Sequence, residues 1–279
     1  MAFLQSFLTT YAQSKLGVVG LSVFLVFIVL AVVTPYIAPF DPDALLVGKP
    51  LSPPSSTYIM GTDSFGRDVL SRILYGTRAS LLVGVLAATT SAIIGIIVGA
   101  IAGYFGGRID DLLMRVAEFF IVLPQFFLAL IMAAIYGPNL LSIILIISIL
   151  GWPTTARLLR AQFLYLRELD FVAASKVVGE PKIRIIFAEI FPNALSPIIA
   201  NSALLVGTAV LLESGLSFMG LSDPNVFSWG KMLGEAQNYI RQAWWLATFP
   251  GSCIFILVLA ANLIGDGLDQ ALNPRLRAV

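Results

Sequence analysis

The sequence predicts an all-α integral membrane protein with six transmembrane helices and both termini in the cytoplasm. Three observations support this prediction: 58% of the 279 residues are hydrophobic, only 12% are charged, and several long stretches contain no charge at all. Soluble domains carry about 25% charged residues, roughly twice the share found here. The composition therefore indicates that most of the chain lies in lipid.

The N-terminal part of the chain supplies the first span and an external segment. Residues 1–15 place apolar side chains on one helical face, which predicts a cytoplasmic, interfacial lead-in. Residues 16–38 carry no charge and reach the roughly 20 apolar residues that a membrane helix needs. No cleavable signal is evident ahead of this span. Residues 39–78 are polar and rich in proline, and we expect them outside, with a short helix at Val69–Leu74 along the membrane surface.

The remaining residues, 79–279, contain the other five spans. These are predicted at 79–105, 112–136, 140–156, 190–212 and 243–264, with a cytoplasmic loop at 168–190, an external loop at 213–242 and a cytoplasmic tail at 265–279. Gly95, Gly99 and Gly103 recur every four residues in the second span. This spacing of small residues lets another helix approach closely.

The distribution of lysine and arginine predicts the orientation. With the N-terminus inside, eleven of the 17 basic residues lie on the cytoplasmic side: Lys15, Arg108, Arg115, Arg157, Arg160, Arg167, Lys176, Lys182, Arg184, Arg275 and Arg277. The other six lie outside: Lys49, Arg67, Arg72, Arg78, Lys231 and Arg241. Cytoplasmic loops carry the excess of positive charge, so this orientation is favoured.

An unusually charged stretch lies between the fourth and fifth spans. Residues 170–193 read DFVAASKVVGEPKIRIIFAEIFPN. Gly179 and Pro181 divide the stretch into two helical halves, since a helix commonly ends on glycine and proline suits the first turn of the next helix. The sequence therefore predicts a docking element for a soluble partner on the cytoplasmic face, and a solvated connector is the alternative.

The composition also excludes several kinds of site. The chain has one cysteine, Cys253, and no histidine, which excludes a disulfide framework, a cysteine zinc site, histidine metal ligands and Ser-His-Asp catalysis. No basic patch is free of the membrane-flanking pattern, so no nucleic-acid partner is expected. The segment GTDSFGRD lacks the spacing of a phosphate-binding loop. We interpret Asp63 as a cap or turn residue and expect Arg67 and Asp68 to pair locally.

The few polar residues within the spans are candidates for a path through the membrane. Asn193, Pro197 and Asn201 interrupt the fifth span, where proline is tolerated if neighbours satisfy the freed backbone groups. Glu213 and Ser214 are expected at an unwound helix end, as an outer gate or a binding-protein contact, and a plain interfacial role is the alternative. Four weaker candidates can equally be helix-packing contacts: Gln125, Ser148, Thr154 and Thr155.

Five motifs in order resemble one family of transport proteins. FVAASKVVG and EIFPNALSPI, from residues 171–198, resemble the cytoplasmic EAA loop of binding-protein-dependent ABC importer permeases. Gly179 aligns the two sequences, so that Ala173, Ala174 and Ser175 fall on Glu-Ala-Ala. The other motifs resemble the C-type permease of the dipeptide, oligopeptide and nickel subgroup: GTDSFGRDVLSRILYGTRASL (61–81), ESGLSFMGL (213–221), SWGKML (228–233) and NLIGDGLDQALNPR (262–275).

The resemblance implies the fold of a type I ABC importer transmembrane domain in the prokaryotic plasma (inner) membrane. The implied partners are a second homologous permease in a heterodimer, two ATP-binding subunits, an extracytoplasmic substrate-binding protein and membrane lipid. ATP and Mg are expected on the ATP-binding subunits. The chain itself is expected to be no enzyme and to bind no cofactor or metal. The resemblance also implies transport by alternating access, coupled through residues 170–193.

The same resemblance places the contact with the ATP-binding subunits in the cytoplasmic loop. The implied residues are Asp170, Phe171, Val172, Ala173, Ala174, Ser175, Lys176, Gly179, Pro181, Lys182 and Arg184. Ala173 stands where the family usually has glutamate. Asp170 is the candidate substitute, as a cap at the positive end of the first helix. We therefore expect Asp170→Ala to weaken coupling or assembly more than Glu180→Ala.

Peptides are the expected cargo within this subgroup. A chain without histidine and with few membrane acids offers little ligation for a bare metal ion. Nickel chelates, glutathione and oligosaccharides are alternative cargoes of the same machinery. The distant alternatives are a membrane enzyme or scaffold without a path, which predicts clustered polar groups, and a secondary transporter, which predicts an internal repeat.

Overall fold

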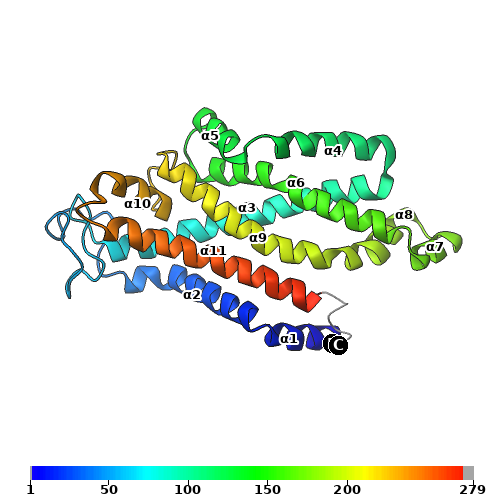
Figure 1. Cartoon of the computed structure of the whole chain (residues 1–279), viewed down its shortest axis with the longest axis horizontal. Coiled ribbons are helices and arrows are strands. Elements are labelled where there is room, and N and C mark those ends of the chain that lie inside the picture. The colour runs from blue at the N-terminus through cyan, green and yellow to red at the C-terminus, as the bar shows by residue number, and fades with distance from the viewer. Residues whose placement is uncertain (1, 273–279) are drawn as a thin grey trace.

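Long helices aligned along one axis make up the structure (Figure 1). The computed structural model describes residues 2–272, and all regular elements in that range are helical, which confirms the predicted fold class. In chain order they are α1 (Ala2–Gln13), α2 (Lys15–Ile37), α3 (Val69–Phe105), α4 (Gly107–Val122), α5 (Gln125–Tyr136), α6 (Leu140–Leu166), α7 (Asp170–Val177), α8 (Lys182–Arg184), a π-helical turn (Ile185–Ile190), α9 (Phe191–Phe218), α10 (Trp229–Ala236), a 3-10 turn (Gln237–Tyr239) and α11 (Trp245–Leu272).

Five of these helical segments are long and apolar enough to cross a membrane. They are α2, α3, α6, the run Lys182–Phe218 that includes α9, and α11. A sixth crossing requires α4 and α5 to act together as one broken span.

The predicted third span, 112–136, is not one continuous helix. α4 and α5 meet at 90°. The cause lies in Leu123 and Pro124, because proline has no N–H to continue a helix and forces the preceding residue into an extended conformation. Leu123 accordingly has φ −77° and ψ 138°. The break therefore places the C-terminal end of α4 next to the N-terminal end of α5.

Several other helices extend beyond the apolar runs that predicted them. The expected surface helix at Val69–Leu74 and the second span form one helix, α3, which is capped by Asp68. α6 continues to Leu166 and α11 to Leu272, past the predicted ends at 156 and 264. Long polar side chains can leave the lipid at such helix ends, which allows the helices to continue. The rest of the predicted tail, 273–279, lies outside the described residues.

A face of small residues brings α3 close to α6. A Cβ atom on Gly95 would lie 2.5 Å from Thr155 Cβ, and one on Gly99 would lie 2.5 Å from the carbonyl oxygen of Ala156. The same separation, 2.5 Å, holds at Gly103 against another α6 side chain. The small-residue face predicted from the sequence is therefore confirmed as a helix–helix contact.

Gly99→Ala is expected to destabilise the protein by about 1–3 kcal/mol, the usual cost of overpacking a filled interior. The new methyl group would meet the backbone of Ala156, which cannot rotate away. Gly251→Ala in α11 is the matched control, because its nearest neighbour is Leu233 Cδ2 at 3.9 Å. This control should be neutral or stabilising by up to about 1 kcal/mol. Unfolding midpoints in a detergent titration measure both, and equal midpoints would contradict the close contact.

A network of buried ion pairs fastens one end of the bundle. The Arg72 side chain is 2% exposed, and its Nη1 donates to Asp63 Oδ2 at 2.9 Å and to Glu235 Oε2 at 2.6 Å. Arg67 bonds to the same two carboxylates at 2.6 and 3.1 Å. The predicted pairing of Arg67 with Asp68 is wrong, because the Asp68 carboxylate caps α3 instead. The network joins the segment after α2 to α3 and α10.

Different elements lie at the two ends of the molecule (Figure 1). α10 and residues 38–68 lie at one end, and α1, α7 and the last turns of α11 lie at the other. This arrangement agrees with the predicted orientation, in which both termini and the charged loop face the cytoplasm. We therefore call the end with α10 the outer end and the end with α7 the inner end.

Candidate functional site

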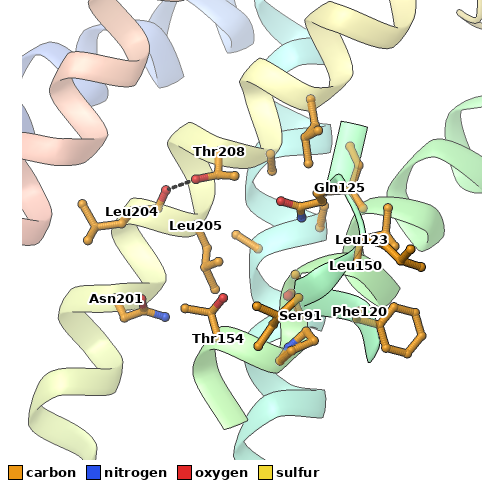
Figure 2. Close-up of a pocket in the computed structure, with 18 of the residues that line it drawn as sticks. Ser91, Phe120, Leu123, Gln125, Leu150, Thr154, Asn201, Leu204, Leu205 and Thr208 are labelled. Carbon is orange, nitrogen blue, oxygen red and sulfur yellow. Dashed lines mark hydrogen bonds between the residues drawn. The ribbon is translucent and has the colours of Figure 1, made fainter. Parts of the chain in front are cut away.

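A cavity of about 460 Å³ lies near the middle of α3, α6 and α9, and the break between α4 and α5 lines one side of it (Figure 2). We call it the central cavity. It is lined by Ala87, Ala88, Ser91, Phe120, Ile121, Val122, Leu123, Pro124, Gln125, Ile147, Leu150, Gly151, Pro153, Thr154, Asn201, Leu204, Leu205, Thr208, Ala209 and Leu212.

The central cavity combines an apolar wall with a few neutral polar groups. Ser91, Gln125, Thr154, Asn201 and Thr208 contribute hydroxyl or amide groups, and none of the described lining residues is charged. The Thr208 hydroxyl donates to the carbonyl oxygen of residue 204 at 3.2 Å, and Asn201 Nδ2 donates to the hydroxyl of residue 155 at 3.1 Å (Figure 2 shows the first of these bonds). Such a surface can exchange hydrogen bonds with a polar ligand without fixing its net charge.

Of the five main path candidates (Asn193, Pro197, Asn201, Glu213 and Ser214), only Asn201 lines this cavity. Pro197 lies on α9 but not among the lining residues, and Asn193 is exposed near the inner end, where its Nδ2 donates to the carbonyl oxygen of Glu189 at 2.7 Å. The four weaker candidates divide into two pairs. Gln125 and Thr154 line the cavity, whereas Ser148 and Thr155 are buried between helices.

Glu213 and Ser214 occupy a different place from the one predicted. α9 continues without unwinding to Phe218, so the expectation of an unwound helix end at Glu213 is wrong. Glu213 is 3% exposed, and its carboxylate accepts hydrogen bonds from Ser217 Oγ at 2.7 Å and Ser214 Oγ at 3.4 Å. α10 lies directly over this site, since a Cβ atom on Gly230 would lie within 2.4 Å of the Ser214 carbonyl oxygen. Both residues therefore sit in the contact between α9 and α10.

The structure offers two lining residues that sequence reasoning missed. Ser91 follows Thr89 and Thr90, and Thr208 stands alone, both within long uncharged runs, like many hydroxyl residues that only bond to their own helix. No signal in the sequence distinguishes them from such residues. Among residues 2–272 no group of three or more acidic or sulfur side chains is arranged to hold a metal ion.

The charged loop at the inner end is ordered as two short helices, as predicted. α7 is followed by Gly179, which has φ +84°, and then by Pro181 before α8. Val172 on α7 is fully buried in an apolar cluster with Leu159 and Phe163 of α6, Ile185 and Ile190 of the π-helical turn, and Ala194 of α9. α7 therefore packs on the π-helical turn that leads into α9, and its Val172 joins a cluster with α6 and α9, both of which line the central cavity.

The outward side of this loop is apolar and flanked by basic groups. Val177 and Val178 are 87% and 81% exposed, and Ile183 and Phe187 are also exposed. Lys176, Lys182 and Arg184 are exposed beside them. We call Phe171, Val177, Val178, Ile183 and Phe187, together with these three basic residues, the coupling surface. Exposed apolar side chains outside the lipid are typical of surfaces that bind other proteins.

The remaining predicted contact residues also lie on this loop. Ala173, Ala174 and Pro181 are exposed and Ser175 is half-buried. Asp170 does not cap α7 as predicted, because Leu169 holds the cap position and no side chain bonds to the first turn. Asp170 is instead an exposed acid in that first turn, where the helix dipole favours negative charge.

Asp170→Ala is expected to lower substrate-stimulated ATP hydrolysis severalfold, whereas Glu180→Ala should change it little. Asp170 is exposed on the loop, without an ion-pair partner in residues 2–272, and is free to meet another subunit. Glu180 pairs with the exposed Arg184 at 3.5 Å, a solvent-screened pair of the kind worth about 0–1 kcal/mol. ATPase assays of the reconstituted complex compare the two, and equal stimulation in both variants would contradict the expectation.

Comparisons with known proteins agree with this architecture. Residues 95–278 match the family described as binding-protein-dependent transport system inner membrane component. Residues 2–54 match the N-terminal TM domain of oligopeptide transport permease C.

Two curated relatives cover nearly the whole chain. The di/tripeptide transport system permease protein DppC of Pseudomonas aeruginosa is 37% identical over 281 residues, which covers 98% of this chain and 93% of that protein. The dipeptide transport system permease protein DppC of Alkalihalophilus pseudofirmus is 40% identical over 267 residues, which covers 95% of this chain and 88% of that protein.

A solved structure shows the same fold. A chain of the MetNI methionine ABC transporter, in an inward-facing conformation, aligns with a TM-score of 0.60 at 18% identity, over 73% of this chain and 97% of that chain. Together, the family match, the near-full-length relatives and the shared fold show that this chain belongs to the binding-protein-dependent ABC importer permeases, as a C-type permease of the dipeptide, oligopeptide and nickel subgroup.

Proposed function

We propose that this chain is one of two permease subunits of an ATP-driven importer of di- or oligopeptides in the prokaryotic plasma membrane. The observation that supports this cargo is the 37–40% identity, over nearly the whole chain, to permeases named for dipeptide transport. The central cavity suits such a cargo, because neutral hydroxyl and amide groups can bond to any peptide backbone and make little demand on its side chains.

In this proposal the energy comes from outside the chain. The lining of the central cavity carries no charged side chain that could exchange protons or ions, so a coupled carrier mechanism has no support there. Two ATP-binding subunits would hold ATP and Mg and would dock on the coupling surface. An extracytoplasmic binding protein would deliver the peptide to the outer end.

The packing of α7 suggests how movement reaches the cavity. Val172 shares a buried apolar cluster with Leu159 and Phe163 of α6 and with Ala194 of α9, so the loop and these two helices can move as one body. A rigid-body rotation imposed at the coupling surface would then reposition the α6 and α9 walls of the central cavity. Such rotations are a common basis of alternating access.

Reconstitution tests the proposal. This permease, a second permease, the two ATP-binding subunits and the binding protein from the same source are placed in proteoliposomes. ATP hydrolysis should rise when the binding protein is loaded with dipeptide, and labelled dipeptide should accumulate only with ATP. The unloaded binding protein is the control.

The same assay separates the cargoes. A binding protein loaded with a nickel chelate, glutathione or an oligosaccharide is tested beside the dipeptide. Stimulation by one of these and not by any peptide would replace the proposed cargo and leave the importer in place. No stimulation and no uptake with any cargo would contradict the proposed function.

A further inference from the structure

We propose that a second cavity, between α4 and α6, binds the charged ends of a peptide as it leaves the central cavity for the cytoplasm, an inference that rests on the proposed peptide cargo. This cavity has a volume of about 360 Å³, and we call it the inner cavity. It is lined by Asp111, Met114, Arg115 and Glu118 of α4 and by Arg157 and Arg160 of α6.

The inner cavity collects nearly all the charge of its part of the chain. Between Arg78 and Arg167 the sequence has seven charged residues: Arg108, Asp110, Asp111, Arg115, Glu118, Arg157 and Arg160. Five of them line this cavity, and Asp110 bonds through both carboxylate oxygens to Arg160. Arg108 is the one that takes no part. In a stretch with so few charges, their meeting in one cavity indicates a site.

The spacing along both helices places these side chains on facing surfaces. Asp111, Arg115 and Glu118 are separated by four and then three residues, and Arg157 and Arg160 by three. Separations of three and four keep side chains on one face of a helix. α4 packs against α6, so the two charged faces meet across the inner cavity.

The inner cavity continues the wall of the central cavity toward the cytoplasm. Val122 follows Glu118 by four residues and Pro153 precedes Arg157 by four, and both Val122 and Pro153 line the central cavity. Beyond Arg157, α6 leads to α7 at the inner end (Figure 1). A peptide moving inward from the central cavity would therefore meet these charges next.

Most of the lining charges have no partner in the described part of the chain. Arg160 is held by Asp110, whereas four exposed lining residues form no ion pair within residues 2–272: Asp111, Arg115, Glu118 and Arg157. Arg115 stands four residues after Asp111 and three before Glu118, separations at which opposite charges commonly pair. Charges at membrane depth are costly against lipid and face water-filled paths or partners instead. These four are therefore available to a ligand.

The mixture of signs points to a zwitterionic ligand. A free peptide has one carboxylate and one ammonium. The guanidinium groups of Arg115 and Arg157 can bind a carboxylate through two parallel hydrogen bonds, and the carboxylates of Asp111 and Glu118 can accept from an ammonium. The phosphate of a lipid headgroup would be repelled by these two acids. The volume also falls within the range of about 300–1,000 Å³ that is usual for small-molecule sites.

The first test locates a bound peptide by photo-crosslinking. The assembled complex in nanodiscs, without binding protein or ATP, is irradiated with a dipeptide whose side chain carries a diazirine, and the adducts are mapped by mass spectrometry. The free dipeptide should label residues 111–118 and 157–160, and excess alanyl-alanine should compete. At the same limiting concentration, the C-terminal amide and the N-acetyl form should each label these segments about tenfold less, because each lacks one end charge.

A pair of variants assigns the carboxylate end. Arg115→Gln combined with Arg157→Gln should lower labelling by the free dipeptide about tenfold and leave labelling by the amide unchanged. Arg108→Gln is the matched control, because Arg108 is exposed on α4 but does not line the inner cavity. It should leave both forms unchanged.

Three results would overturn the inference. The first is the absence of label from both segments in a complex that imports the same dipeptide. The second is equal labelling in the double variant and in Arg108→Gln. The third is loss of the second permease from the purified double variant, which would assign these charges to the contact between the two permeases.

The second test asks whether transport uses the inner cavity. Dipeptide import into proteoliposomes, with the binding protein present, should fall about tenfold in Arg157→Gln, because the carboxylate end loses a charge that receives it. Arg157→Lys should retain more import, since it keeps the charge but not the two parallel bonds. Equal import by Arg157→Gln and Arg108→Gln, at equal complex assembly, would contradict a role in transport.

The outcomes distinguish the inference from the function on which it rests. If the unaltered complex imports no peptide, the proposed function fails before the site is tested. If the unaltered complex imports peptide and the variants behave alike, the function stands and the site fails.

Discussion

Replacing Arg72 with methionine is expected to destabilise the outer end of the protein by about 3 kcal/mol or more. Arg72 is almost fully buried and bridges Asp63 and Glu235 at 2.9 and 2.6 Å. Removing one partner of a buried ion pair leaves the other charge without compensation, which costs roughly 3–5 kcal/mol. Arg67 still contacts Asp63 at 2.6 Å and Glu235 at 3.1 Å in the variant, so the lower part of that range is expected.

The tryptophans make this change measurable. Trp229 Nε1 donates to the carbonyl oxygen of Ile73 at 3.1 Å, and Trp245 Nε1 donates to that of Thr62 at 3.1 Å, so both indoles are anchored near the network. Their fluorescence during a denaturing detergent titration gives an unfolding midpoint for the outer end. Arg72→Met should lower that midpoint strongly.

Two further variants control for charge and for burial. Arg72→Lys keeps the charge but presents one ammonium where the guanidinium bonds to two carboxylates, so it should fall between the wild type and Arg72→Met. Arg184→Met removes an exposed arginine paired with Glu180 at 3.5 Å, and it should change stability by about 0–1 kcal/mol. An unfolding midpoint for Arg72→Met equal to that of Arg184→Met would show that the buried network stabilises the protein no more than an exposed ion pair does.

The membrane helices of this fold could be predicted from the sequence, because a long apolar segment in lipid satisfies its backbone hydrogen bonds only as a helix or in a closed barrel. A charge-free run of about 20 residues has few alternatives to a membrane helix, so the spans that became α2, α3, α6 and α11 were located, although their ends were not. Helix ends lie where charged side chains find water or partners, and those partners come from distant segments. Arg160, for example, extends α6 by pairing with Asp110 of α4.

The break at Pro124 could not be predicted from composition. Pro35, Pro153, Pro197 and Pro250 also lie in apolar runs, and the structure keeps each of them inside a helix. Whether a proline breaks a span depends on which neighbours satisfy the backbone groups that it frees. That information is spread over several helices and is absent from the local sequence.

The candidate site was predictable in part for the same reason. The loop at 170–193 was located because Gly179 and Pro181 mark a helix end and a helix start, and the local backbone alone sets these two preferences. Ser91 and Glu213 were missed or misplaced because their surroundings are built by helices far away in the chain. Glu213 lies beside Ser214, whose backbone meets Gly230 of α10, and Ser91 meets Gly151 of α6. Tertiary neighbours, and not local pattern, decide what such single polar residues do.

Introducing a charge on the coupling surface is expected to remove the ATP-binding subunits from the complex. Val178 is 81% exposed and is not one of the buried core residues, so Val178→Glu should leave the stability of the permease nearly unchanged. Burying a valine against a partner contributes about 1.5–3 kcal/mol. Losing that contact and burying an unpaired carboxylate should therefore weaken the docking of the ATP-binding subunits by about a hundredfold.

Co-purification of the ATP-binding subunits with a tagged permease measures this loss, and substrate-stimulated ATP hydrolysis should disappear with it. Leu45→Glu is the matched control, because Leu45 is exposed and apolar but belongs to residues 38–68, the segment at the outer end. It carries the same new charge and should keep the ATP-binding subunits bound. If Val178→Glu retained these subunits as well as Leu45→Glu does, docking would have to occur elsewhere, and the rigid connection from α7 to α6 and α9 would not carry the coupling.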